Sequence, residues 1–402
     1  MEFGYLSVNV YASDVSTPLK DAEVSVVGFE NKNYTNDLGK TDNIVLETEN
    51  KENSFDFNNK KVSICYDIVV SKEGFSNITI KGIEIYSGII TVQNVFMHPK
   101  ELNKEEEIIL DPIVIEGNYS AKYEEKQLSK FTPKILKKVL IPEYLIVHDG
   151  YPNDSSAPNY YVNFSDYIKN VASCEVYPTW NKEALKANIL AIISFTLNRI
   201  YTEWYQSKGY NFSITSITAY DQKYSYGKTY FDSISLIVDE VMPVYIKRSG
   251  NEEPLFAQYC DGKVTQNKGW LYQWGSNELA GNGYNYEYIL KYYYGNNLSF
   301  EKADYISGLP TSFPGYNLSK GDCGEEVKVI QEQMNIIRGN YPGLIEIKNT
   351  NGEFDDNTEE SIKFFQKTFY LKVTGIVDYD TWYKLSYLYT AIKKMLNGVY
   401  DR

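Results

Sequence analysis

Hydrophobic and polar residues alternate along the first part of the chain, which is the pattern of half-buried β-strands. Turn-forming residues separate the runs, as in a small antiparallel sandwich. We therefore predict an antiparallel β-sandwich over residues 1–99, with His98-Pro99 at the end of its last strand. The alternating or β-branched runs are residues 5–11, 22–27, 66–70 and 89–96.

Residues 100–138 are rich in charge and lack sustained periodicity, which predicts an exposed linker that is open to proteolysis. Lys137 and Lys138 form a dibasic pair directly before the apolar Val139 and Leu140. The junction between Lys138 and Val139 is therefore a candidate processing site, although dibasic pairs also occur on ordinary solvated surfaces.

Residues 139–308 combine strand and helix patterns, which predicts a mixed α+β domain. Residues 145–147 have strand character, and a helix at 166–170 leads to Glu175. The run 183–201 is apolar on nearly all sides of a helix, so we expect it to be central and buried. Further helices are expected at residues 233–241 and 286–294.

The last segment, residues 309–402, has its own core pattern. Val327, Ile330, Met334 and Ile337 recur at helical spacing, and residues 361–366 open another amphipathic helix. This predicts a compact three-helix domain. The whole chain, at 402 residues, is expected to be a multidomain α+β protein.

The net charge and the composition indicate which classes of partner the chain is expected to bind. The formal net charge is -13 and no Lys/Arg cluster offers a basic face, so we expect no nucleic-acid partner. No apolar run is long enough to span a bilayer and no secretory signal is visible, so we expect no membrane insertion. The 38 tyrosines suit sugar faces or protein interfaces, but codon bias would also produce them, so only local clusters are informative.

The cysteine pattern argues against a metal or other cofactor. Cys65, Cys174, Cys260 and Cys323 lack metal-ligand spacing, and the chain has only two histidines. A thiol nucleophile built from Cys174 or Cys260 with His148 is an alternative, yet nothing in the sequence places a base beside either sulfur. We therefore expect buried structural cysteines.

Glu175 is the most informative candidate for chemistry. It is a lone carboxyl between apolar and aromatic residues in the run from Tyr167 to Trp180. Desolvation disfavours the charged form, so a carboxyl held there would keep its proton longer than a free glutamate and could act as a general acid. The alternative is that Glu175 caps the following helix or lies in water.

The last segment resembles the peptidoglycan-binding domain 1 family. The resemblance implies an anchor for wall glycan or stem peptide. The matching residues, in order, are Leu318, Gly321-Asp322, Gly324, Val327, Gln331, Gly352-Glu-Phe354, Thr358, Phe365-Gln366, Leu371, Gly375 and Thr381-Trp382.

The middle segment resembles the lytic transglycosylase domain of the stage II sporulation protein D type. In that family the glutamate of the first landmark is the catalytic acid/base, which corresponds to Glu175. Some members bind zinc around a "Y-H-x-x-C" stretch, but residues 258–262 lack the His and one Cys, so the resemblance implies no metal here. The landmarks are Ala172–Pro178 with Glu183–Ala187, Tyr220–Tyr224, Gln273–Gly275 and Gly283–Leu290.

The N-terminal run 72–76 resembles the "K-x-G-Y" turn of carboxypeptidase regulatory-like sandwich domains. Together with residues 147–150 and 155–161, the domain order resembles clostridial spore cortex-lytic enzymes of the SleC type. Those enzymes are zymogens cut by germination-specific serine proteases. The resemblance implies a spore location, cortex peptidoglycan and such a protease as partners, and a cut near Lys138-Val139.

The implied activity is cleavage of the bond between N-acetylmuramic acid and N-acetylglucosamine, with Glu175 forming 1,6-anhydro ends. A hydrolytic muramidase, a non-catalytic wall-binding or amidase-enhancing protein, and an amidase or peptidase remain alternatives. Candidate second carboxylates are Asp149, Asp166, Glu183 and Asp221. Candidate substrate-binding residues are Asp221, Gln222, Tyr224, Gln273, Trp270 and Trp274, with Trp180 as a further stacking candidate.

Overall fold

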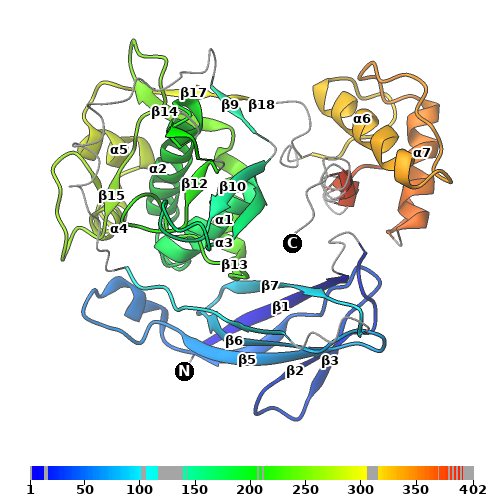
Figure 1. Cartoon of the computed structure of the whole chain (residues 1–402), viewed down its shortest axis with the longest axis horizontal. Coiled ribbons are helices and arrows are strands. Elements are labelled where there is room, and N and C mark those ends of the chain that lie inside the picture. The colour runs from blue at the N-terminus through cyan, green and yellow to red at the C-terminus, as the bar shows by residue number, and fades with distance from the viewer. Residues whose placement is uncertain are drawn as a thin grey trace.

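The structure is a computed structural model with a mixed α+β fold made of several sheets and helices (Figure 1). It describes residues 2–12, 17–100, 106–115, 139–142, 144–205, 208–210, 212–305, 316–369 and 371–378, and residues 381, 382, 384, 385, 388, 389 and 392. None of the helices in these ranges has the length and apolar composition needed to cross a bilayer.

The N-terminal region forms two sheets that share one apolar core. One sheet has the order β3-β2-β5-β6-β8 and the other has the order β13-β7-β1-β4. All four predicted strand runs are present, because their alternating residues place one face in this core. The strands are β1 (Glu2–Ala12), β2 (Glu23–Val26), β3 (Lys32–Tyr34), β4 (Ile44–Thr48), β5 (Ile64–Ser71), β6 (Ile78–Ile85), β7 (Ile90–Met97), β8 (Glu106–Ile109) and β13 (Tyr230–Phe231).

The pairing in these sheets differs from a purely antiparallel sandwich. The pairs β1–β7 and β6–β8 are parallel. Strand β7 ends at Met97, as expected, but it is not the last strand of the sandwich, because β8 follows it in the chain. Local patterning does not reveal strand direction or partner, since both depend on contacts between residues far apart in the chain.

The segment 106–115 does not form an exposed linker. Strand β8 extends the sandwich sheet, and Leu110 is buried in the sandwich core. Ile113 and Ile115 are buried in the core of the next domain. The apolar run is short and directly follows three consecutive glutamates at 105–107, so it shows no strand or helix periodicity in the sequence.

The central region is built around the buried helix α2 (Lys182–Tyr201), which contacts α1, α3, α4 and α5 (Figure 1). The Asn181 side chain accepts a hydrogen bond from the Glu183 N–H and caps this helix. The predicted helices correspond to α1 (Phe164–Glu175), α2, α3 (Asp232–Val241) and α5 (Tyr286–Tyr294), whereas α4 (Gln273–Gly281) was not expected. The strands are β9 (Leu140–Ile141), β10 (Tyr144–His148), β11 (Asn159–Asn163), β12 (Ile214–Thr215), β14 (Val244–Arg248), β15 (Tyr259–Cys260), β16 (Leu271–Tyr272), β17 (Leu298–Lys302) and β18 (Asp304–Tyr305).

Glu84 joins the sandwich to the central region through a buried carboxylate. Its Oε1 accepts hydrogen bonds from Ser63 Oγ (3.2 Å) and Tyr86 Oη (2.8 Å). Its Oε2 accepts from the Ile113 N–H (3.0 Å) and from Lys228 Nζ (3.1 Å). The Glu84 and Lys228 side chains are each only 1% exposed. This carboxylate therefore connects the sandwich, the segment 106–115 and the central region.

Further contacts surround this ion pair. Strand β13 pairs with β7, so the central region supplies a strand to the sandwich sheet (Figure 1). Gly227 has a φ of +72°, and a Cβ at this position would lie 3.0 Å from the Ile108 side chain. A side chain there would require a strained backbone and would press on β8. Glycine thus permits the close approach of the two regions.

The C-terminal region has a separate apolar core. It contains α6 (Glu325–Asn340) and α7 (Asp356–Thr368), and the described residues between 381 and 392 are helical. Gln331 Nε2 donates to the Glu353 carbonyl and to Thr358 Oγ1, which fastens the turn before α7 onto α6.

We predict that Lys228→Ala strongly destabilises the junction. The substitution leaves the Glu84 carboxylate buried without its counter-charge, which typically costs roughly 3–5 kcal/mol. Urea unfolding followed by tryptophan fluorescence measures this loss, because Trp180 Nε1 donates to the Ser54 carbonyl across the same junction. Lys263→Ala, which removes an exposed ion pair with Glu278, is the control and should cost less than about 1 kcal/mol. Equal losses for the two variants would contradict the role given to Glu84.

Candidate active site

Glu175 is the last residue of α1 and its side chain is buried, with the residue 4% exposed. The helix begins at Phe164 and is capped by Asn163, whose side chain accepts a hydrogen bond from the Ser165 N–H. It ends at Glu175 because Val176 adopts an extended backbone shortly before Pro178. The desolvated position agrees with the expectation from sequence. The alternative role as a cap of the next helix is filled by Asn181 instead.

Three donors from separate parts of the chain contact the Glu175 carboxyl. The Lys223 N–H donates to Oε1 at 3.0 Å, and the Tyr259 hydroxyl lies 3.4 Å from the same oxygen. Gln273 Nε2 donates to Oε2 at 3.2 Å and to the Glu175 main-chain carbonyl at 2.9 Å. The loop after β12, strand β15 and the first residue of α4 thus orient this carboxyl together.

Gln273 is a predicted binding residue that the structure brings to Glu175. The sequence did not identify Tyr259 or the Lys223 N–H as groups that contact Glu175. Tyr259 lies inside the stretch 258–262, which was considered only for its lack of zinc ligands. The Lys223 donor is a backbone group, so no residue pattern could identify it.

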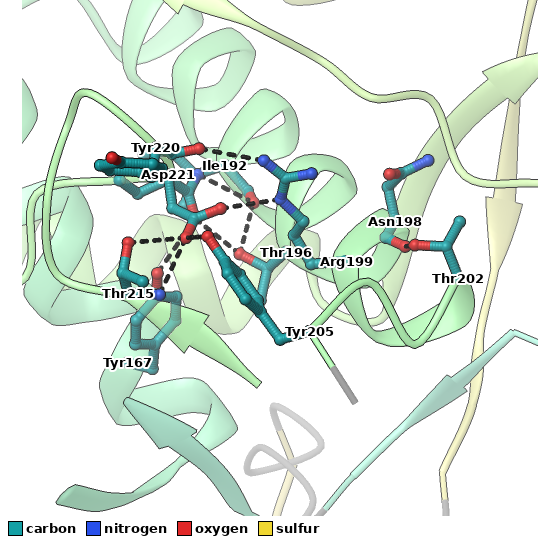
Figure 2. A network of polar contacts seen from close by, with 11 residues as sticks. Tyr167, Ile192, Thr196, Asn198, Arg199, Thr202, Tyr205, Thr215, Tyr220 and Asp221 are labelled. Carbon is teal, nitrogen blue, oxygen red and sulfur yellow. Dashed lines mark hydrogen bonds and ion pairs between the residues drawn. The ribbon is translucent and has the colours of Figure 1, made fainter. Parts of the chain in front are cut away.

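Asp221 has a structural role. Its Oδ1 accepts from Arg199 Nε at 2.7 Å, and both side chains are buried. Its Oδ2 accepts from Tyr205 Oη (2.6 Å), the Thr215 N–H (2.8 Å) and Thr215 Oγ1 (2.7 Å), as Figure 2 shows. Burial first, and the Asp221 charge second, raise the pKa of Tyr205, so its phenol remains a donor. Asp221 therefore fastens the loop before Lys223 to α2.

Gln222 is likewise buried in the core, with 0% of the residue exposed. Its Oε1 accepts from Tyr167 Oη (3.2 Å) and Thr196 Oγ1 (2.8 Å). Its Nε2 donates to the Ile192 carbonyl at 3.3 Å. These contacts hold the same loop between α1 and α2, so in this structure the Gln222 amide is bonded to protein groups.

The predicted aromatic residues lie in different environments. Trp180 and Trp274 are buried with ring centroids 5.1 Å apart. Trp274 also packs edge-on against Phe57 of the sandwich region, so these two tryptophans belong to the domain junction. Trp270 is half-buried in the turn before β16. Tyr224 is half-buried beside Lys223, which keeps it near Glu175.

The candidate second carboxylates are dispersed. Asp166 is exposed on the first turn of α1. Glu183 Oε2 accepts from the Tyr286 N–H at 2.8 Å and so supports the start of α5. Asp149 is half-buried just after β10, and its charge is among the influences that raise the pKa of Tyr224 after burial.

The cysteines and His148 are not arranged as a nucleophile and base. His148 Nδ1 contacts Asn159 Oδ1 at 2.8 Å, and Nε2 contacts the Tyr151 carbonyl at 3.0 Å. Cys174 lies 3.7 Å from Asn170 Oδ1, and burial raises its pKa to about 11. Cys260 Sγ contacts the Thr265 carbonyl at 3.2 Å. Both sulfurs have structural neighbours, and a buried thiol of high pKa is a poor nucleophile.

The loop at the family's zinc position is organised by a carboxylate. Asp261 is 0% exposed, and its Oδ1 accepts from the N–H groups of Lys263 (2.7 Å) and Val264 (2.5 Å). The Thr265 N–H lies 3.1 Å from Oδ2. Within the described ranges, no three His, Cys, Asp or Glu side chains are grouped to hold a metal ion.

Two family models match the chain. The model described as "Stage II sporulation protein" matches residues 155–244, which include Glu175 and Lys223. The model described as "Putative peptidoglycan binding domain" matches residues 323–385, which include α6 and α7. No curated protein matches this chain. The chain thus combines a stage II sporulation protein domain with a C-terminal peptidoglycan-binding domain, which confirms its likeness to spore cortex-lytic enzymes of the SleC type.

Proposed function

We propose that this chain is the precursor of a lytic transglycosylase that cleaves spore cortex peptidoglycan between N-acetylmuramic acid and N-acetylglucosamine. One observation carries the proposal: a buried carboxyl, Glu175, lies within the residues that match the sporulation model and is oriented by three donors, of which Lys223 belongs to the matched range and Tyr259 and Gln273 follow it in the chain. The C-terminal match supports peptidoglycan as the ligand, and the sporulation match supports a role in the spore.

Glu175 first acts as a general acid. It gives its proton to the glycosidic oxygen as the bond from C1 of N-acetylmuramic acid to that oxygen breaks. The C6 hydroxyl of the same sugar attacks C1, and Glu175 takes the proton of this hydroxyl. The products are a 1,6-anhydro end and a free hydroxyl on N-acetylglucosamine, and no water is consumed.

The contacts of Glu175 suit this two-way proton transfer. After the first step the carboxylate is charged in a buried site, where hydrogen-bond donors stabilise charge more strongly than they do in water. The Lys223 N–H, Tyr259 and Gln273 supply such donors without adding a second negative charge. Two carboxylates are the usual requirement of a hydrolytic glycosidase, whereas the intramolecular route requires one.

A hydrolytic muramidase is the second candidate, and Asp149 is the observation in its favour. It is a half-buried carboxylate near Tyr224 that could activate a water molecule. A non-catalytic wall-binding or amidase-enhancing protein is the third candidate.

We further propose that the N-terminal region restrains the enzyme until proteolysis. Residues 223–231 run from Glu175 to the sandwich. The Lys223 N–H contacts Glu175, the Gly227 carbonyl accepts from Gln93 Nε2, and Lys228 pairs with Glu84. The sandwich therefore fastens the loop whose Lys223 N–H donates to the carboxyl, which supports a restraint on the rearrangement of this loop.

The proposed activating cut, by a germination-specific serine protease, lies before Val139. Lys138 lies outside the described residues. The Val139 carbonyl accepts from the Asp304 N–H at 3.2 Å, and β9 pairs with β18 directly after it. A chain that begins at Val139 keeps these contacts with the central region, which supports this position for the cut.

Glu175→Gln should lower the release of anhydro ends roughly 100- to 10,000-fold, because the substitution preserves shape but removes the transferable proton. The measurement is mass spectrometry of cortex peptidoglycan digested with the chain cut before Val139. Glu278→Gln, an exposed position on α4, is the control and should retain activity.

Near-normal anhydro release by Glu175→Gln would contradict the assignment. Reducing ends from the unsubstituted chain would instead identify a muramidase, and the absence of any product would identify a binding protein.

Proteolysis before Val139 should increase the release of anhydro ends, because it frees the N-terminal region to leave the loop 223–231. Digests by intact and cut chain at equal concentration measure the change. A chain with Lys137→Gln and Lys138→Gln, treated with a lysine-specific protease, is the control for cuts elsewhere. Equal activity of intact and cut chain would show that the N-terminal region does not inhibit.

A further inference from the structure

Three tyrosines form a continuous row beside the candidate active site. The ring of Tyr226 stacks on Tyr160 with centroids 4.7 Å apart, and Tyr160 lies 6.4 Å from Tyr224. We call Tyr160, Tyr224 and Tyr226 the tyrosine strip. Tyr226 is 49% exposed, whereas Tyr160 and Tyr224 are half-buried. The strip therefore begins at the surface and runs inward.

The inner end of the strip meets the residues that hold Glu175. Tyr224 directly follows Lys223, whose N–H donates to Glu175. Its ring stacks on Tyr167 at 5.9 Å, and Tyr167 belongs to α1, the helix that ends at Glu175. One loop and one helix thus connect the strip to the carboxyl, so a ligand on the exposed end of the strip would contact the loop that also supplies a donor to Glu175.

The chemistry of the strip suits uncharged rings. Tyrosine has a flat apolar ring and a polar hydroxyl, which allows contact with the face of a sugar and hydrogen bonds to its edge. Burial raises the pKa of Tyr224, so its hydroxyl stays neutral. A chain of net charge -13 is a poor surface for a phosphate polymer, whereas neutral N-acetylated sugar rings do not require a basic site.

We propose that the tyrosine strip binds the N-acetylated sugar rings of the glycan strand that flank the scissile bond. The identity of the glycan rests on the proposed function, while the binding site itself is defined by the three rings and their connection to Glu175.

The chain offers a matched control on α5 and in the turn that precedes it. Tyr284 stacks on Tyr288 at 4.2 Å, and Tyr288 lies 6.4 Å from Tyr292. These rings are 41%, 44% and 62% exposed, so Tyr288 matches Tyr226 in residue type and exposure, whereas all three are more exposed than the half-buried Tyr160 and Tyr224. Helix α5 packs against α2, α4 and β16, which differ from the loop and helix that connect the strip to Glu175.

The test measures binding separately from catalysis. The parent protein for this test is the complete 402-residue chain with the substitution Glu175→Gln, cleaved by protease before Val139. It is titrated with oligomers of N-acetylglucosamine, and binding is measured by calorimetry. Adding Tyr226→Ala should weaken binding roughly two- to tenfold, because an aromatic contact contributes about 0.5–1.5 kcal/mol. Tyr226→Phe keeps the ring and should retain the affinity, and Tyr288→Ala should match the parent.

Unchanged affinity in Tyr226→Ala would overturn the proposal, as would an equal loss in Tyr288→Ala or no binding by the parent chain. Loss in both Tyr226→Ala and Tyr226→Phe would overturn stacking as the mode of binding. Because Glu175→Gln removes turnover, these outcomes leave the transglycosylase proposal untouched. Binding on the strip without anhydro products from the unsubstituted chain would remove that proposal alone.

Discussion

The arrangement of the N-terminal sandwich and the central region depends on the hydrogen bonds and the ion pair of one buried carboxylate, that of Glu84. Its four donors come from the sandwich, the segment 106–115 and the central region. A buried charge is tolerated only when it is paired and hydrogen-bonded, so all three segments must be in place together. The strand pair β7–β13 and the aromatic contact between Tyr86 and Phe231 lie at the same junction.

The same logic extends to the candidate active site. The loop between β12 and β13 is held at both ends by buried ion pairs, Arg199–Asp221 before Lys223 and Glu84–Lys228 after it. Between these anchors the Lys223 N–H contacts Glu175. The Lys223 N–H that contacts the Glu175 carboxyl is therefore positioned by two buried ion pairs. One lies inside the central region, and the other lies at the junction of this region with the sandwich. This connection is the physical basis for proposing that proteolysis in the N-terminal region affects the site.

Local patterning predicted elements well where one face is buried in a regular way. The run 183–201 corresponds closely to α2, and the alternation at 5–11 lies within β1. It failed for residues 106–115, because a short apolar run between acidic residues has no period of its own. It also did not show that Asp221 and Gln222 form hydrogen bonds inside the core, because the position of a polar residue in a motif does not reveal whether its side chain faces a cleft or the core.

By itself, the sequence determined the type and order of the main elements and the peptidoglycan-binding resemblance, and it singled out Glu175 as the candidate for chemistry. These features depend on local periodicity and on residue identities in order along the chain. Only the tertiary structure decided which donors surround Glu175, that Trp180 and Trp274 belong to the domain junction, and that Tyr160, Tyr224 and Tyr226 form a row. Those facts depend on contacts between residues as much as 217 positions apart, as between Phe57 and Trp274, and no local pattern encodes them.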